Sequence, residues 1–61
     1  MTMVNVRVFN EWFEEVRNDS FMVSREEMET YYKSEERIGV AMAKRYKIPF
    51  GEKDLVLADI D

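Results

Sequence analysis

Residues 4–9 of this chain read Val-Asn-Val-Arg-Val-Phe, and the rest of the predicted architecture is built outward from them. Apolar and polar side chains alternate over residues 4–8, which is the period of a β-strand with one buried face. Residues 4, 6 and 8 would then face a hydrophobic core. The alternation loosens around Trp12 and Phe13. A bulge near Asn10 and a strand with both faces partly covered are therefore both open.

A turn and a second strand are predicted next. Residues 17–20 read Arg-Asn-Asp-Ser, and the short polar side chains in such a stretch favour a turn because they hydrogen-bond to their own backbone. Residues 21–23, Phe-Met-Val, have the composition of a short strand. Two strands joined by a compact polar turn should pair antiparallel as a hairpin.

A helical pattern follows the hairpin. Ser24 with Glu27 has the form of a capping box, which marks the start of a helix. Apolar residues then recur at spacings of three and four as far as Tyr46. We expect one helix over residues 25–46, stopped by Pro49. A second start at Ser34 stays open, with a short helix or extended segment before a main helix over residues 35–46.

The last predicted strand, residues 55–60, is more continuously apolar than the first, as is typical of a strand that is central or covered on both faces. Together these elements predict a single domain over residues 1–61. Its class is α+β, in the order β-β-α-β, with a three-stranded, mainly antiparallel sheet and one helix packed on one face. The final strand would return beside the first. The other face of the sheet would stay uncovered and offer an apolar contact surface.

The 61 residues include no histidine and no cysteine. These are the side chains that most often carry nucleophilic catalysis, proton transfer near neutral pH and transition-metal binding. Asp54, Asp59 and Asp61 lack the spacing of a calcium loop. We therefore expect a protein that is not an enzyme and that has no cofactor and no metal.

Size and charge indicate a protein partner. A chain this short buries only about 60% of the surface that its unfolded form exposes, so binding to another protein, or self-association as a homodimer, would supplement its stability. The net charge of −4 favours a basic partner and disfavours nucleic acid and anionic membranes. No apolar run approaches a membrane span, no leader pattern is seen and no cysteine is present, so we expect a cytoplasmic protein.

The candidate partner-binding residues are the aromatic side chains around the hairpin and the carboxylates near them. Tryptophan is a frequent anchor of binding hot spots, and acidic residues at a rim speed association with a basic partner. A hydrophobic core for the aromatic residues and a solvated surface for the carboxylates is the plain alternative. The set comprises Phe9, Trp12, Phe13, Glu14, Glu15, Phe21, Glu26 and Glu27.

Two other functions remain open. An acidic surface could imitate the phosphates of a nucleic acid and occupy a basic cleft, although arginine and lysine residues interrupt it. Its residues would be Glu26, Glu27, Glu29, Glu35 and Glu36. The basic cluster of Lys44, Arg45 and Lys47 either complements the end of the helix or contacts RNA in a small regulator.

The order of these motifs resembles a known family of small phage proteins. The matching segments are Val6-Arg7-Val8, Trp12-Phe13, Asp19-Ser20-Phe21, the helix end Ala41-Met42-Ala43-Lys44-Arg45-Tyr46 and a short acidic last strand. They are similar to the discriminator of mRNA degradation of T-even bacteriophages, a small antitoxin that binds and blocks a host RNA-cleaving toxin. The residues between Met22 and Lys33 depart from that pattern, so no contact is carried over there. The resemblance implies a small phage inhibitor of a larger, nucleic-acid-processing host protein.

Overall fold

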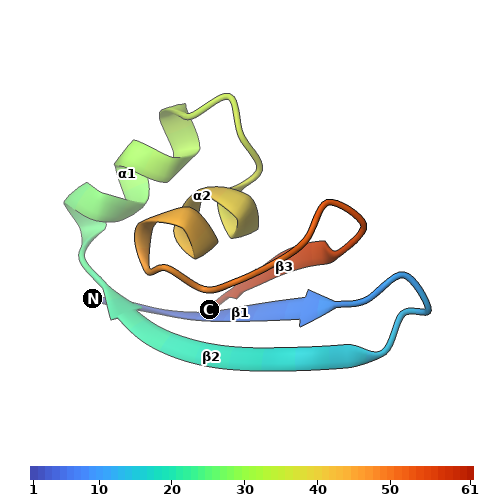
Figure 1. Cartoon of the computed structure of the whole chain (residues 1–61). Coiled ribbons are helices and arrows are strands. Elements are labelled where there is room, and N and C mark those ends of the chain that lie inside the picture. Colours follow the sequence, from blue (N-terminus) through green and yellow to red (C-terminus); the bar gives the residue numbers. More distant parts are fainter.

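The computed structural model describes residues 1–61 as two layers, a sheet and a pair of helices on one side of it (Figure 1). In chain order the elements are β1 (Thr2–Phe9), β2 (Glu15–Val23), α1 (Arg25–Lys33), α2 (Ile38–Arg45) and β3 (Leu55–Ile60). The strands are antiparallel and lie in the order β2-β1-β3. The predicted α+β class and three-stranded antiparallel sheet are confirmed, and the last strand does return beside the first.

The alternation in β1 is confirmed as the basis of the core. Val4 and Val6 are completely buried and Val8 is nearly so, all on the side of the sheet that faces the helices. The helices and the adjoining segments supply the rest of a single cluster of ten buried side chains. These are Val4, Val6, Val8, Val23, Met28, Tyr31, Met42, Ala43, Ile48 and Val56.

The hairpin is confirmed, but the turn predicted at residues 17–20 is wrong. Those residues lie within β2, where Arg17 pairs with Val8 and Ser20 pairs with Asn5. The turn is formed by residues 10–14 instead. Polar side chains are tolerated in β2 because it is an edge strand and stays mostly exposed. The register of the pair shifts between Val8 and Phe9, which places a bulge beside the position expected from the sequence.

The single long helix is also wrong, and the alternative with a second start at Ser34 is closer, because the structure has two helices separated at residues 34–37. A helix over residues 25–46 would be about 33 Å long, whereas the longest extent of the whole molecule is 34 Å. Dividing the helix lets both halves lie over the same small sheet (Figure 1). At the break, Ser34 adopts an extended backbone and its Oγ accepts a hydrogen bond from the Glu36 N–H at 3.1 Å. Neither helix is long and apolar enough to cross a membrane.

β3 lies at an edge of the sheet, so the central position expected for it is wrong and belongs to β1. β3 is covered on one face by α2, where the helix backbone comes very close at Gly39. A Cβ atom at Gly39 would lie 3.0 Å from the Val56 carbonyl oxygen and 3.2 Å from the Ala58 nitrogen. Val56 and Ala58 are therefore explained by close packing against one helix, whereas Leu57 lies on the uncovered face and is partly exposed.

The sequence signals at the helix ends are partly confirmed. Ser24 Oγ accepts the hydrogen bond from the Glu27 N–H at 3.2 Å, as expected of a cap. At the other end of the helical region, Lys47 has a left-handed backbone with φ of 57°. The Ile48 N–H then reaches back to the Ala43 carbonyl oxygen at 2.8 Å, which ends α2 ahead of Pro49.

Candidate partner-binding surface

The loop between β1 and β2, residues 10–14, is held together by Asn10. The Oδ1 atom of Asn10 accepts hydrogen bonds from the N–H groups of Trp12, at 2.9 Å, and Glu14, at 3.0 Å. The Asn10 N–H donates to the Glu14 carbonyl oxygen, and the Phe13 N–H donates to the Asn10 carbonyl oxygen. Four hydrogen bonds thus order this five-residue loop. Each of them involves the side chain or the backbone of Asn10, and together they fix the direction of the loop.

The two aromatic residues of this loop, Trp12 and Phe13, are called the aromatic tip below. Trp12 is 71% exposed and Phe13 is 78% exposed. Phe13 also has a left-handed backbone, with φ of 62°. For a residue with a Cβ atom this conformation costs about 1 kcal/mol. The fold gains little buried surface from either ring, so the tip contributes nothing evident to stability.

Carboxylates border the aromatic tip. Glu14 Oε1 accepts a hydrogen bond from Asn10 Nδ2 at 3.0 Å, which holds this carboxylate beside the loop. Glu11 lies 3.7 Å from the ammonium group of Lys53 and is otherwise open to solvent. An exposed pair at this distance is weak and exchanges readily with another cation. The tip therefore combines two exposed rings with two acidic side chains.

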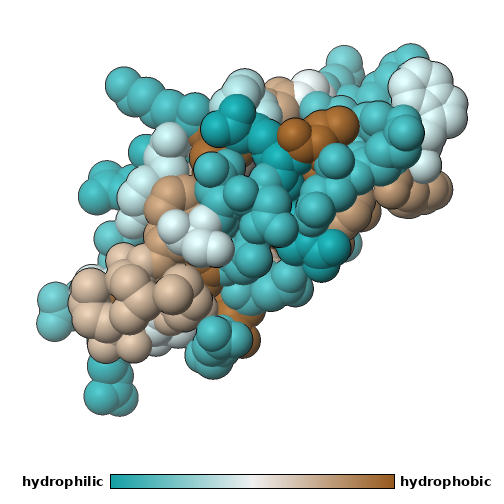
Figure 2. Space-filling view, turned by 90° about the horizontal axis from the view of Figure 1, so that it is seen from below, coloured by the Kyte–Doolittle hydropathy of each residue, from teal (hydrophilic) through white to brown (hydrophobic).

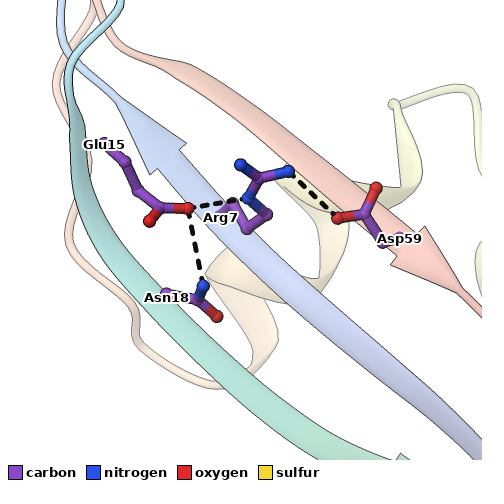
Figure 3. Close-up of polar contacts among 4 residues, drawn as sticks. All are labelled: Arg7, Glu15, Asn18 and Asp59. Carbon is purple, nitrogen blue, oxygen red and sulfur yellow. Dashed lines mark hydrogen bonds and ion pairs between the residues drawn. The ribbon is translucent and has the colours of Figure 1, made fainter.

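The face of the sheet that points away from the helices, called the open face below, is not uniformly apolar. Arg7 lies at its centre, where its Nε is 2.7 Å from Glu15 Oε1 and its Nη1 is 3.4 Å from Asp59 Oδ2 (Figure 3). The hydrogen bond to Glu15 is the main cause that raises the pKa of Arg7 above its ordinary value. The guanidinium carbon also lies 5.0 Å from the centroid of the Phe9 ring, as in a cation–π contact.

Apolar side chains also lie on the open face, and one of them, Leu57, pairs directly with Arg7 across β1 and β3. Met3 and Met22 pair across β1 and β2, and both side chains are about half exposed. Leu57 on β3 is slightly less exposed. Figure 2, which views the molecule from below the sheet, shows mainly hydrophilic side chains over the middle and apolar ones gathered toward the two ends. The uncovered face expected from the sequence exists, but its middle is an ion-pair network.

Phe9 and Phe21, both predicted to bind a partner, are partly buried within the fold. Phe9 lies beneath Arg7 on the open face. Phe21 lies on the helix side, where its ring stacks on Tyr46 with 4.4 Å between the centroids and 16° between the planes. These two rings are therefore less available to a partner than Trp12 and Phe13.

Glu26 and Glu27 lie at the other end of the molecule. They begin α1, directly after β2, whereas the aromatic tip precedes β2 (Figure 1). The nine residues of β2 separate the two places, which corresponds to about 26 Å at the rise of a strand. The predicted site residues are consequently not one surface. Glu14 and Glu15 lie near the tip, while Glu26 and Glu27 do not.

Glu27 has a structural role between the two helices. Its carboxylate accepts hydrogen bonds from the hydroxyl groups of Tyr31 on α1 and Tyr46 at the end of α2. These two bonds, Tyr31 first, lower the pKa of Glu27, while burial is the main cause that raises the pKa of Tyr31. The hydrogen bond to Glu27 is the main cause that raises the pKa of Tyr46. A shallow depression of about 310 Å³ beside this cluster is lined by Glu26, Glu27, Thr30, Tyr31 and Arg45.

Some charged side chains of the surface lie in ion pairs. Arg17 pairs with Asp19 at 3.1 Å, Lys44 pairs with Glu36, and Arg7 lies between two carboxylates. No group of three or more carboxylates is placed to hold a metal ion.

Asn10 was not among the predicted site residues, although it organises the loop that carries two of them. The signal was present in the sequence, since asparagine at the first position of a short segment between strands commonly accepts hydrogen bonds from the backbone beyond it.

Comparison with protein-family models, characterised proteins and solved structures gave no match to this chain.

Proposed function

We propose that this protein is a small, non-enzymatic inhibitor that binds a larger protein by inserting the aromatic tip into an apolar pocket. Occupation of that pocket would exclude the substrate or ligand of the larger protein. The single observation that carries the proposal is the exposure of Trp12 and Phe13, at 71% and 78%, on a loop fixed by hydrogen bonds. A fold with no binding partner gains nothing from presenting these rings to water.

The energetics of the aromatic tip support an anchoring role. Large aromatic side chains dominate interface energetics, and full burial of one such ring gives a gross gain of about 1.5–3 kcal/mol. The loop is already ordered by Asn10, so a partner would not have to supply the free energy of ordering it. A preformed loop with two large anchors is typical of a binding hot spot.

The charge of the molecule supports a basic partner. Glu11 and Glu14 adjoin the tip, and the net charge of the chain is −4. Basic residues around the partner's pocket would speed association with this surface. Proteins that process nucleic acids have such surfaces, and the sequence resemblance to phage antitoxins supports an antitoxin-like or anti-host inhibitor acting in the cytoplasm.

Imitation of a nucleic acid and direct RNA binding have less support. Glu36 pairs with Lys44, and the carboxylate of Glu27 is taken up by two tyrosine hydroxyls. The same ion pair reduces the charge of the basic cluster that RNA binding would use. Charge reversal of Glu26 and Glu29 should then slow association with the partner without abolishing binding, whereas an acidic mimic would lose its activity.

The test uses the full-length protein as bait in bacterial lysates, with Trp12→Ala as the variant and Tyr32→Ala as the matched control. Tyr32 is an aromatic residue that is 60% exposed on α1, away from the tip. Proteins retained by the wild type and by Tyr32→Ala but lost by Trp12→Ala are identified by mass spectrometry. The purified partner is then titrated with each variant, and its own activity is measured.

We expect Trp12→Ala to weaken the affinity about a hundredfold or more, as truncation of a hot-spot anchor does, and Tyr32→Ala to leave it unchanged. The wild type should also inhibit the partner's activity at one molecule per site. Equal affinity for a folded Trp12→Ala variant, or binding that leaves the partner's activity intact, would contradict the proposal.

A further inference from the structure

The outer edge of β2 is free along its whole length. β2 pairs with β1 on one side only, at the end of the sheet order β2-β1-β3. Residues 15–18 and Ser20 are exposed, and no other segment lies along this edge in Figure 1. An edge strand presents a row of backbone N–H and C=O groups that can pair with a further strand. With nine residues, β2 is also the longest strand of the protein.

We propose that β2 pairs antiparallel with β2 of a second copy of this chain, about a two-fold axis that passes between the two Asn18 residues. The two three-stranded sheets would join into one continuous sheet. The proposal concerns a different surface from the aromatic tip and does not depend on the proposed function. The order of charges along β2 supports this pairing.

Symmetry restricts the possible registers. Residues directly opposite each other in an antiparallel pair lie on the same face of the sheet, so a two-fold axis must pass between two copies of one residue. Arg17 and Asp19 share the helix side of β2, since their partners on β1 are the buried Val8 and Val6. An axis at Asn18 places each Arg17 opposite Asp19 of the second copy, and the contact is made twice.

Neighbouring registers lack this complementarity. An axis at Arg17 or at Asp19 would place two like charges directly opposite each other, which is destabilising. An axis at Ser20 would place Asp19 opposite Phe21 and Arg17 opposite Val23. Charges on an edge strand usually deter pairing, but opposite charges on either side of a neutral residue attract each other in the register centred on that residue and in neither of the two registers next to it.

The other edge of the sheet does not offer the same contact. β3 contains one charged residue, Asp59, and no cation, so no symmetric pairing of β3 brings opposite charges together. A small domain with only 11 of 61 residues buried has a limited core, and joining two sheets would add to its stability.

The first experiment reverses the charges singly and then together. Sedimentation equilibrium of the wild type up to millimolar concentration should show a monomer–dimer equilibrium. Arg17→Asp and Asp19→Arg should each weaken the dimer about tenfold or more, because two attractive pairs become repulsive. The double variant Arg17→Asp/Asp19→Arg restores both pairs and should regain wild-type dimerisation. Lys33→Glu, on the exposed face of α1, serves as the charge control.

The second experiment uses the absence of native cysteine to locate the axis. Asn18→Cys should form a disulfide-linked dimer on oxidation, because opposite Cα atoms lie about 4.5–5.5 Å apart. Ser20→Cys should not, since its copies would be offset by four residues, about 13 Å, beyond the reach of a disulfide. A monomer at all concentrations, dimers that survive the single reversals, or equal cross-linking at both positions would each overturn the proposal.

Discussion

Asn10 positions the aromatic tip, which contributes little to the fold. Its Oδ1 atom accepts two backbone hydrogen bonds, from Trp12 and Glu14, and its backbone makes two more within the loop. Phe13 can keep its left-handed backbone because these bonds surround it. The aromatic tip is thus ordered by an asparagine that itself need not contact the partner.

Asn10→Ala should lower the free energy of unfolding by about 1 kcal/mol, because two backbone N–H groups lose their acceptor. It should also weaken partner binding, since the tip would have to be ordered on association. Urea unfolding measures the first effect. Asn18→Ala makes the same truncation at a residue whose side chain makes one hydrogen bond, from its Nδ2 to Glu15 Oε1 at 3.5 Å. It should change the free energy of unfolding much less. Equal losses in the two variants would contradict the role given to Asn10.

Glu27→Gln should change how stability depends on pH. The hydrogen bonds from Tyr31 and Tyr46 lower the pKa of Glu27 in the folded protein below its ordinary value of 4.5. The unfolded state therefore binds more protons in acid, so this stabilisation is complete above the ordinary pKa and is lost as the pH falls through the lowered one. We expect Glu27→Gln to be less stable at neutral pH and to lose less stability on acidification.

The measurement for Glu27 is the free energy of unfolding in urea at a series of pH values from neutral to strongly acidic. Glu29→Gln removes the same charge from the exposed side of α1 and serves as the control. Curves for Glu27→Gln and the wild type that run parallel down to low pH would show that the tyrosine bonds do not stabilise the ionised carboxylate.

Among the secondary-structure elements, the contact between α2 and β3 is the closest backbone approach in the fold that a glycine permits. Gly39 lies on α2 where the backbone of residues 56–58 leaves no room for a Cβ atom. Glycine inside a helix normally costs about 1 kcal/mol relative to alanine. Its presence here is therefore explained by packing of the helix directly on the strand.

Gly39→Ala should destabilise the protein by about 1–3 kcal/mol, because α2 must move away from β3 to make room. The direction is informative, since alanine stabilises an unconstrained helix position. Gly51→Ala is the control, as its Cβ would meet only the Asp54 side chain at 3.4 Å. Thermal and urea unfolding of both variants measure the difference. A Gly39→Ala variant more stable than the wild type would show that the contact is looser than described.

The sequence predicted β1, the existence of a hairpin and the cap at Ser24, because each depends on a local pattern. It misplaced the turn, because the composition of residues 17–20 suits both a turn and an exposed edge strand, and only pairing with β1 distinguishes the two. It joined the two helices, because the apolar spacing continues across Ser34. The second start left open at Ser34 lies at the observed break, but the choice between the two alternatives depends on the size of the sheet, which no short pattern in the chain records.

The arrangement of the candidate site residues could be predicted only where it depends on a local pattern. Local composition pointed to Trp12 and Phe13, and both are exposed in the structure. Nearness in sequence did not show that Phe21 faces the helices, since that depends on the register of β2 against β1. Nor could it show that Glu27 is held by Tyr46, a residue 19 positions away, because only the fold brings them together.

In the whole molecule, the buried core and the aromatic tip lie in different places. It measures 34 × 21 × 17 Å, and its buried side chains lie between the helices and one face of the sheet. The aromatic tip extends from one end of that sheet, with the edge of β2 beside it and the start of α1 at the other end (Figure 1). Substitutions at the tip should therefore alter binding while leaving the core intact.

Fluorescence of Trp12 offers the most direct test, because it is the one tryptophan of the chain and reports on the aromatic tip alone. Acrylamide quenching would be measured for the free native protein, for the protein unfolded in urea, and for the complex with the captured partner. We predict that the free native protein is quenched almost as efficiently as the unfolded chain, and that the partner sharply reduces quenching. Strong protection of Trp12 in the free protein, or quenching unchanged in the complex, would contradict insertion of the tip into a partner.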